Sequence, residues 1–393
     1  MAPLQLYLFS RFLTTMAYQI QSLAVAWQVY GIRKEPLDLG WVGLAQFVPM
    51  LAFSLFGGQV ADRVDRKKIL KFAYLSWMAT VVAMSVATAL GQVHLALFLV
   101  LLFAQGTIRA FSNPAAHAFI TQVTSDSDLK RAIALGASTW QISTILGPVI
   151  GGFLYGALGG ATWVYAICAI SSGCGVLLLQ YVAAREQEKT ADPLNLQNIF
   201  SGVEYVWKNR MILGCISLDL FAVLFGGASA LLPAFASDIL FLGPTGLGVL
   251  RAAPAVGAIV MSLILARRPI KTKAGMWLFI HVVIFGLATI GFGVSKTAWL
   301  SFIMLFITGA SDMVSVVIRM TLVQAATPPQ MRGRVSAVNS IFISASNELG
   351  EFESGVTANW FGIIPAVILG GLGAICVAAV WSWKFPELRR MEE

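Results

Sequence analysis

Long apolar runs recur along nearly the whole chain, and each is close to the length that an α-helix needs to cross a lipid bilayer. The hydrocarbon core is spanned by roughly 20 helical residues, because a helix satisfies its own backbone hydrogen bonds in lipid. Only 12% of the 393 residues are charged, which is about half the fraction typical of soluble proteins. These features predict a polytopic membrane protein and leave no room for a sizeable soluble domain.

The pattern of these runs predicts an all-α membrane protein with twelve transmembrane helices in two pseudo-symmetric six-helix bundles. The spans are expected at residues 4–30, 40–61, 69–90, 94–122, 132–157, 161–183, 211–236, 246–266, 274–295, 299–325, 335–358 and 363–384. A single long polar connection, residues 184–210, follows the sixth span. It divides the chain into an N-terminal bundle at 1–183, a cytoplasmic inter-bundle loop and a C-terminal bundle at 211–393.

Positive charge is concentrated on one side of this arrangement. Twenty of the 27 Lys and Arg residues fall in the even-numbered loops and the C-terminus, three fall in the opposite loops and four lie inside helices. Because positive residues are retained on the cytoplasmic side of a membrane, both termini are predicted to be cytoplasmic. The net charge of +8 is therefore a topology signal. The expected partners are the lipid bilayer, a small-molecule substrate and protons, without nucleic acid, and the chain is expected to be a monomer.

The two halves resemble each other when one is shifted along the other. An offset of 205 residues places Pro49 on Pro254, and an offset of 203 places Gly106 on Gly309. Such internal repeats are typical of transporters that arose by duplication.

The connection between the second and third spans combines a glycine, an aspartate and basic residues at regular spacing: Gly58, Asp62, Arg63, Arg66 and Lys67. A glycine permits close approach of a neighbouring helix, and the aspartate can meet an arginine or a helix N-terminus. The pattern resembles the G-x-x-x-D-R-x-x-R-K signature of the major facilitator superfamily. The resemblance implies a latch that holds the two halves in the outward-open state. A plain positive-inside loop would explain the basic residues but not the spacing.

The fifth span contains Gly147, Pro148, Gly151 and Gly152. Glycines one turn apart let helices pack tightly, and the proline removes one hydrogen bond and allows a bend. The run resembles the G-P-x-x-G-G element of the antiporter branches of that superfamily, which implies a hinge and favours export over import. Ordinary small-residue packing is the alternative interpretation.

Ionisable residues inside the spans are the most informative feature, because a charge at the middle of a membrane helix costs roughly 2.5 to 3.5 kcal/mol. Five of them are expected to face a central cavity and to carry proton coupling: Arg109, Asp312, Arg319, Glu348 and Glu351. The 203-residue offset superimposes Arg109 on Asp312, which predicts an ion pair across the cavity. Glu348 and Glu351 share a helical face, as proton carriers would.

Structural pairing within the C-terminal bundle, such as Arg319 with a glutamate of the eleventh span, is the alternative role for these charges. Five further polar residues are expected to line the cavity: Arg11, Gln46, Asn113, Gln141 and Asp219. Neither a metal nor a cofactor is expected, because the cysteines and histidines lack the spacing of a ligand set.

The run N-E-L-G-E-F-E-S-G at residues 347–355 resembles a segment of the bacterial enterobactin exporter and macrolide efflux branch of the superfamily. The resemblance implies a drug:proton antiporter in the bacterial inner membrane, exporting a small amphipathic compound, drug-like or siderophore, by alternating access. An importer or uniporter of a small solute or metal ion is the alternative transporter. A membrane-embedded enzyme or receptor is disfavoured, because the sequence has no catalytic constellation.

Overall fold

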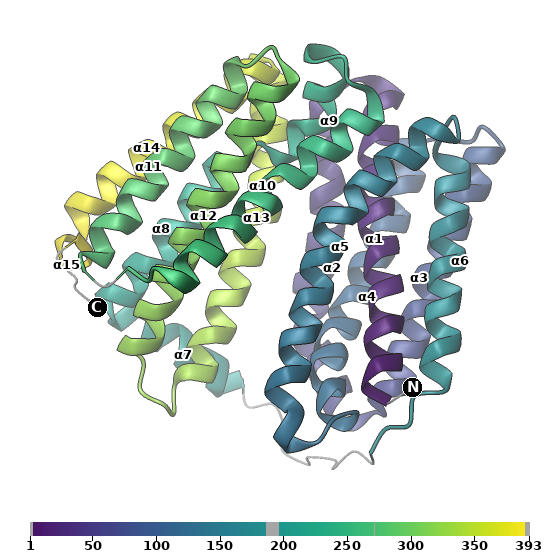
Figure 1. The fold of residues 1–393 in the computed structure, drawn as a ribbon, viewed down its shortest axis with the longest axis horizontal. Coiled ribbons are helices and arrows are strands. Elements are labelled where there is room, and N and C mark those ends of the chain that lie inside the picture. Colours follow the sequence, from purple (N-terminus) through teal and green to yellow (C-terminus); the bar gives the residue numbers. More distant parts are fainter. Residues whose placement is uncertain (1–2, 186–195, 271, 390–393) are drawn as a thin grey trace. The chain divides into compact units, whose positions relative to one another are not determined.

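The computed structural model describes residues 3–185, 196–270 and 272–389, and its described residues form helices and no strands. Helical structure is found at all twelve predicted spans (Figure 1). The first six are α1 (Pro3–Arg33), α2 (Pro36–Arg63), α3 (Arg66–Ala89), α4 (Leu95–Gln122), α5 (Leu129–Ala157) and α6 (Ala161–Gln180). The next begin with α8 (Arg210–Gly226) and continue as α10 (Gly243–Arg267), α11 (Ala274–Val294), α12 (Ala298–Ala326), α13 (Arg332–Phe361) and α14 (Ile363–Lys384).

Ten helical stretches of the described chain are long and apolar enough to cross a membrane. The other two spans, α1 with 31 residues and α13 with 30 residues, have the length but carry more polar side chains. Short helices complete the chain, namely η1 (Asp126–Asp128), α7 (Leu196–Lys208) in the inter-bundle loop, and α15 (Pro386–Arg389). Residues 186–195 of the predicted loop lie outside the described residues.

The chain packs into two compact units. Unit 1 comprises residues 1–34, 44–193 and 242–252, and unit 2 comprises residues 35–43, 194–241 and 253–393. Unit 1 therefore includes the start of α10, and unit 2 includes the start of α2. The predicted bundle boundaries instead assign the start of α10 to the C-terminal bundle and the start of α2 to the N-terminal bundle. In unit 1, α1 packs on α5 and α6, and α3 packs on α4 and α6. In unit 2, α11 packs on α12 and α14, and α8 packs on α13 and α14.

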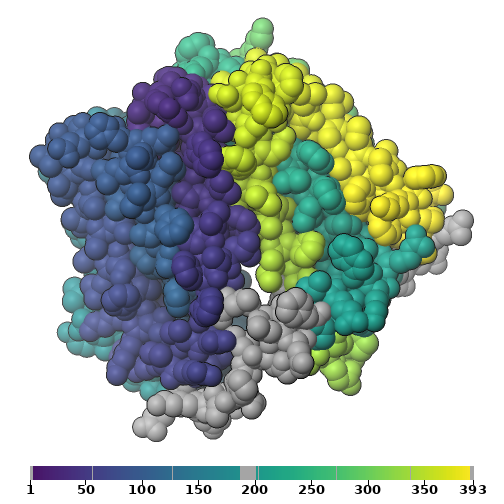
Figure 2. Space-filling view, turned by 180° about the vertical axis from the view of Figure 1, so that it is seen from behind, coloured from purple at the N-terminus to yellow at the C-terminus, as the bar shows by residue number. Residues whose placement is uncertain are grey.

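Buried apolar side chains hold each unit together, as in Tyr7, Leu70 and Phe119 of unit 1 and Ile212 and Val314 of unit 2. Apolar side chains also cover the outside. The surface of α14, yellow in Figure 2, exposes Leu369, Leu372, Val380 and Trp383. Large apolar groups on the outer face of a helix are expected where lipid replaces water.

The internal repeat is visible in the packing of each unit by itself. A Cβ on Gly106 of α4 would overlap the Gln46 carbonyl oxygen of α2, and a Cβ on Gly309 of α12 would overlap the Pro254 carbonyl oxygen of α10. The glycines paired by the sequence offset thus allow equivalent close helix contacts.

The seventh span differs from the single helix predicted at 211–236. It consists of α8, a 3₁₀ turn η2 (Ala228–Leu231), α9 (Leu232–Ala234) and a π-helical turn η3 (Phe235–Ile239). The break lies at Gly227, next to another glycine, where helix propensity is low. The Ser354 hydroxyl of α13 donates a hydrogen bond of 3.0 Å to the Gly227 carbonyl oxygen, which the break leaves without its helical partner.

Candidate functional site

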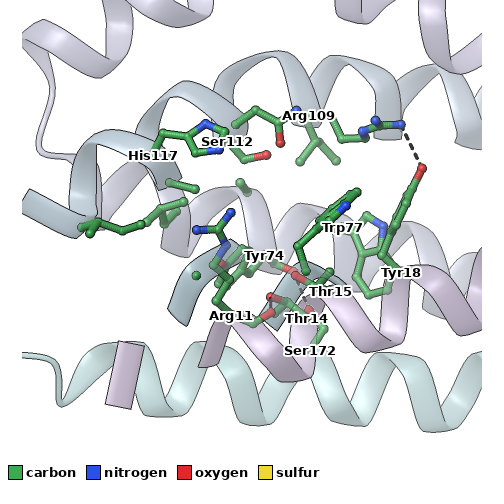
Figure 3. Close-up of a pocket in the computed structure, with 18 of the residues that line it drawn as sticks. Arg11, Thr14, Thr15, Tyr18, Tyr74, Trp77, Arg109, Ser112, His117 and Ser172 are labelled. Carbon is green, nitrogen blue, oxygen red and sulfur yellow. Dashed lines mark hydrogen bonds between the residues drawn. The ribbon is translucent and has the colours of Figure 1, made fainter. Parts of the chain in front are cut away.

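Unit 1 contains a cavity of about 750 Å³ between α1, α3, α4 and α5 (Figure 3). Its walls are built by the helical repeat, because residues spaced by three or four positions share one face of a helix. Its lining comprises Arg11, Thr14, Thr15, Tyr18, Leu70, Ala73, Tyr74, Trp77, Ile108, Arg109, Ser112, Asn113, Ala116, His117, Ile120, Ile133, Gly136, Ala137, Trp140, Gln141 and Ser172. A volume of this size suits a drug-sized ligand.

Arg109 lies in the wall formed by α4. Its Nη1 donates a hydrogen bond of 2.9 Å to the Tyr18 hydroxyl of α1, and its guanidinium carbon lies 5.2 Å from the centre of the Tyr18 ring. The Tyr18 hydroxyl in turn donates to Oε1 of Gln46 at 3.2 Å. The guanidinium is therefore held in place by an aromatic ring and a short chain of neutral hydrogen-bonding groups.

Two further groups of the lining carry N–H donors. Arg11 lies on the opposite side of the cavity from Arg109 in Figure 3, and its Nη1 lies 3.4 Å from the position of a Cβ built on Gly136 of α5. The Trp77 side chain of α3 is only 7% exposed, and its Nε1 has no hydrogen-bond partner among the described residues. A buried N–H without a partner costs free energy.

Three of the predicted cavity residues, Arg11, Asn113 and Gln141, line the cavity. Gln46 is not in the lining but contacts it through Tyr18. Asp219 lies outside it, because this residue belongs to unit 2. The sequence interpretation missed Tyr18, Tyr74, Trp77 and His117. The helical spacing of polar residues could have identified two of them, since Tyr18 follows Arg11 by seven positions and His117 follows Arg109 by eight.

Unit 2 contains a buried ion pair in place of an open cavity. Nη1 of Arg319 on α12 pairs with Oδ1 of Asp219 on α8, and the two side chains are 2% and 9% exposed. The alternative pairing of Arg319 with a glutamate of the eleventh span is therefore not the pairing that the structure contains. The approach of α8 and α12, which sequence spacing does not reveal, brings these two side chains together.

Asp312 lies two turns before Arg319 on α12 and lines a narrow space of about 10 Å³ together with Asp219, His281 and Ser315. The space is too small for a substrate, and it is lined by groups that can exchange protons. The predicted ion pair between Arg109 and Asp312 joins residues of two different units, and it stays a prediction.

Glu348 and Glu351 project from one face of α13 toward the start of α2. A Cβ built on Gly43 would lie 2.9 Å from Oε2 of Glu351 and 3.4 Å from Oε2 of Glu348. Nearby, a Cβ on Gly40 would lie 3.2 Å from the Phe352 backbone. All five residues belong to unit 2, so the glycines of α2 leave the space that the two carboxylates occupy.

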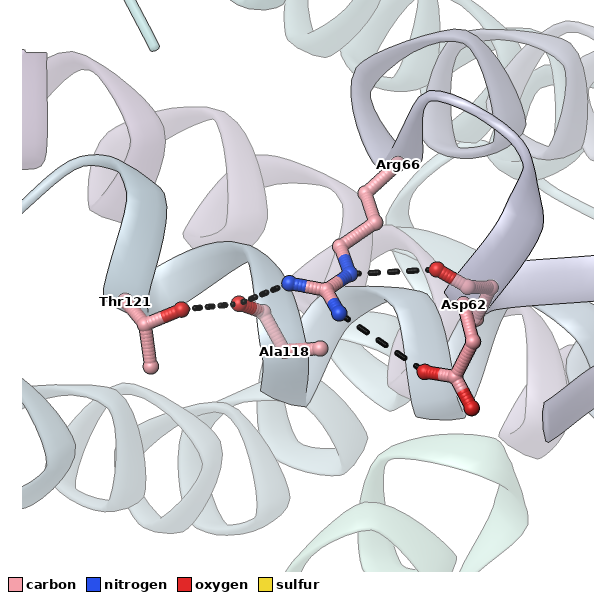
Figure 4. Close-up of polar contacts among 5 residues, drawn as sticks. Asp62, Arg66, Ala118 and Thr121 are labelled. Carbon is pink, nitrogen blue, oxygen red and sulfur yellow. Dashed lines mark hydrogen bonds and ion pairs between the residues drawn. The ribbon is translucent and has the colours of Figure 1, made fainter. Parts of the chain in front are cut away.

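The predicted latch residues form a local network at the α2–α3 connection (Figure 4). Arg66 Nη2 lies 3.7 Å from Asp62 Oδ1, and its Nε and Nη1 donate to the carbonyl oxygens of Ala61 at 3.1 Å and Ala118 at 3.4 Å. Thr121 also donates to the Ala118 carbonyl oxygen. Arg66 therefore connects the end of α2 to the end of α4 within unit 1.

The neighbouring residues of the connection have different surroundings. Lys67 donates to the carbonyl oxygens of Gln180 and Val182 after α6, at 2.9 and 2.7 Å. Arg63 is exposed. The close helix approach expected at Gly58 is found one position earlier: a Cβ on Gly57 would overlap the Ala110 carbonyl oxygen, whereas a Cβ on Gly58 would meet nothing within 4 Å. The expectation was wrong because the contacting face of α2 depends on its rotation.

The glycines of the predicted hinge form a seam along α5 in unit 1. Gly147 and Gly151 pack against Gln19 and Ile20 of α1. A Cβ on Gly152 would overlap the Pro244 carbonyl oxygen at the start of α10. In return, a Cβ on Gly248 of α10 would overlap the carbonyl oxygen of Pro148. α5 and the start of α10 thus touch backbone to backbone.

Comparison with known proteins assigns nearly the whole chain to one family model, since residues 7–350 match that of the Major Facilitator Superfamily. The enterobactin exporter EntS of Shigella flexneri is 25% identical over 375 residues, covering 93% of this chain and 84% of the exporter. EntS of Citrobacter koseri is 24% identical over 370 residues, with the same two coverages.

Solved structures share the fold at lower sequence identity. The nucleoside transporter NupG has a TM-score of 0.77 and 15% identity, covering 98% of this chain and 100% of that chain. A bacterial homologue of the human lysosomal transporter Spinster has a TM-score of 0.75 and 15% identity, covering 99% of this chain and 97% of that chain. These likenesses establish the shared architecture.

Proposed function

Because the chain belongs to the Major Facilitator Superfamily, we propose that this multi-pass membrane transporter exports a small amphipathic compound by alternating access, driven by protons. The observation that carries the proposal is the cavity of about 750 Å³ in unit 1, whose lining mixes aromatic, apolar and hydrogen-bonding side chains. A mixed lining of this kind binds drug-sized molecules that have both apolar and polar parts.

Relatives support the direction of transport. The relatives compared above are named enterobactin exporters and align over 93% of this chain. The glycine seam of α5 supports the same direction through the antiporter-type element that it contains. We place the protein in a bacterial inner membrane, as a monomer with both termini in the cytoplasm, where most of its basic residues would then lie.

Proton coupling is assigned to the carboxylates of unit 2. Asp312 lines a narrow space beside His281, and Glu348 and Glu351 share the face of α13 that faces Gly43. Carboxylates in membrane helices are costly, which is why they mark functional or structural positions. Asp219 pairs with Arg319, and we assign it to holding unit 2 together.

The conformational change is assigned to the two glycine-containing elements of unit 1. Asp62, Arg63, Arg66 and Lys67 act as a latch at the α2–α3 connection, where Arg66 already links α2 to α4. The Gly147–Gly152 segment acts as the hinge, since its glycines let α5 pack closely on α1 and on the start of α10.

The test uses purified protein in proteoliposomes with an imposed pH gradient and two fluorescent xanthene dyes, fluorescein and rhodamine 123, as probe substrates. Glu348→Gln and Asp312→Asn are expected to abolish uphill dye movement. Both variants should still exchange dye across the membrane without a gradient, because exchange requires no net proton transfer. Glu387→Gln, which changes a carboxylate of α15 outside the spans, is the matched control and should transport normally.

Uphill transport that persists in both variants would remove Glu348 and Asp312 as proton carriers. Dye movement that never depends on the pH gradient in the unaltered protein would contradict proton coupling as a whole. Net movement in the direction opposite to that of an antiporter would indicate an importer.

A further inference from the structure

The cavity of unit 1 has a strongly one-sided charge. Two arginines, Arg11 and Arg109, and His117 line it, and none of the described lining residues is acidic. The described acidic residues of unit 1, Asp62, Asp65, Asp126 and Asp128, lie at helix ends or in the connections between spans and not in the cavity.

We propose that the substrate is an amphipathic aromatic anion, so that the cavity binds a carboxylate, sulfonate or phenolate group between Arg11 and Arg109. The inference deepens the transporter function proposed above and rests on it. A fixed positive charge favours an anionic guest and disfavours a cation. Arginine also presents several N–H groups in a planar fork that matches a carboxylate or sulfonate.

Trp77 provides an independent indication of an acceptor group on the guest. Trp77 lines the cavity, and its indole Nε1 is buried and lacks a hydrogen-bond partner among the described residues. Figure 3 shows Trp77 on α3, on the same wall of the cavity as Tyr74. An oxygen of a bound anion would satisfy this N–H and remove its desolvation cost.

The aromatic part of the guest is inferred from the rings that surround the charged groups. Tyr18, Tyr74, Trp77 and Trp140 come from three different helices and line the same space. Flat rings stack on flat rings and on guanidinium groups, and Arg109 already lies over the Tyr18 ring at 5.2 Å. An aromatic guest can make the same contact with either partner.

The test compares the binding of two xanthene dyes of similar size and opposite charge, fluorescein and rhodamine 123, to the protein in lipid nanodiscs. Equilibrium dialysis against empty nanodiscs corrects for partition into lipid. Fluorescein is expected to bind about tenfold or more tightly than rhodamine 123, the difference that one charge-assisted hydrogen bond can supply.

Variants locate the binding to the charged walls. Arg109→Gln and Arg11→Gln should each weaken fluorescein binding about tenfold, Arg109→Lys should retain most of it, and Trp77→Phe should weaken it several-fold. Arg251→Gln is the matched control, because Arg251 is an arginine of the same unit that donates to Ser22 at 3.0 Å and does not line the cavity. The unfolding temperature of each variant shows that it remains folded.

Rhodamine 123 binding as tight as fluorescein, or fluorescein binding that Arg109→Gln and Arg11→Gln leave unchanged, would overturn the inference. Gradient-driven transport of rhodamine 123 without preference for fluorescein would also overturn it while leaving the transporter function intact. Tight and arginine-dependent fluorescein binding without gradient-driven movement would instead support the inference and contradict the proposed function.

Discussion

The charged residues inside the membrane helices are mostly basic in unit 1 and mostly acidic in unit 2, where Arg319 is the partner of Asp219. Unit 1 carries Arg11 and Arg109 in a cavity of about 750 Å³ and no acidic lining residue among those described. Unit 2 carries Asp312, Glu348 and Glu351 inside its helices, and its narrow space of about 10 Å³ has two aspartates in its lining. The difference suggests a division of labour in which one unit recognises the substrate and the other handles protons.

The comparison also separates the acidic residues of unit 2 from one another. Asp219 pairs with a buried arginine, and Glu348 and Glu351 lie close to Gly43 of α2. Acidic residues with the same apparent setting in the sequence therefore have different neighbours. The following substitutions distinguish residues that stabilise the fold from residues that are needed for transport.

The largest effect is expected from Asp219→Ala. Removing one partner of a buried ion pair leaves an uncompensated charge and costs about 3 to 5 kcal/mol. Arg319 and Asp219 are 2% and 9% exposed, so water cannot replace the lost partner. Thermal unfolding in detergent should show a large drop in the transition temperature. The double variant Asp219→Leu with Arg319→Met should recover most of the stability, and a failure to recover it would indicate that the pair has a role beyond neutralising charge.

A smaller effect, on transport alone, is expected from Gly152→Val in the glycine seam of unit 1. The added side chain would overlap the Pro244 carbonyl oxygen, and misplacing a packed helix by about 1 Å can reduce a rate by two orders of magnitude. Fluorescein transport should fall at least about tenfold, while binding in nanodiscs is retained.

Gly31→Ala is the control for the seam, because a Cβ at Gly31 meets nothing within 4 Å. If both glycine variants transported normally, the seam would be passive packing and unit 1 would have no moving contact there.

A still smaller effect, a modest loss of stability, is expected from Asp65→Ala. The Asp65 carboxylate caps α3 by accepting hydrogen bonds from the backbone N–H groups of Lys67 at 2.8 Å and Lys68 at 3.4 Å. Loss of such a cap costs about 1 kcal/mol. Because this acidic residue of unit 1 lies outside the spans, the pH dependence of transport should stay the same. A shifted pH profile would show that unit 1 also takes part in proton handling.

The smallest effect is expected from Glu204→Gln on α7. Glu204 and Lys208 form an ion pair of 2.5 Å, but their side chains are 63% and 76% exposed. The hydrogen bond from Lys208 lowers the pKa of the Glu204 carboxyl. The pair therefore contributes above the usual carboxyl pKa and is lost as the pH falls through the lowered value. Unfolding at neutral pH should be almost unchanged, and a large loss of stability would contradict the solvent exposure of this ion pair.

Much of the architecture follows from the sequence because lipid imposes a simple rule on backbone hydrogen bonds. Apolar runs predict all twelve spans, and the sequence offset correctly pairs Gly106 with Gly309, which occupy equivalent packing positions. The break at Gly227 could not be predicted in the same way. It depends on a hydrogen bond from Ser354, which lies 127 positions away in the chain.

The candidate site was predictable only in part. Arg11 and Arg109 stand out in the sequence because their charge is costly in lipid, whereas Tyr18 and Trp77 are common membrane residues whose position facing a cavity depends on helix rotation. The same uncertainty of rotation explains why the close contact occurs at Gly57 and not at Gly58. The Asp219–Arg319 pair depends on which helices become neighbours, and spacing along the chain carries no such information.

The interrupted seventh span has a mechanical consequence. Ser354 donates its hydrogen bond to the broken segment from the same helix that bears Glu348 and Glu351, which lie six and three positions before it. If α13 rotates when its carboxylates gain or lose protons, the break at Gly227 must either move with Ser354 or lose this hydrogen bond. Rotation of α13 would then change the length and direction of the seventh span.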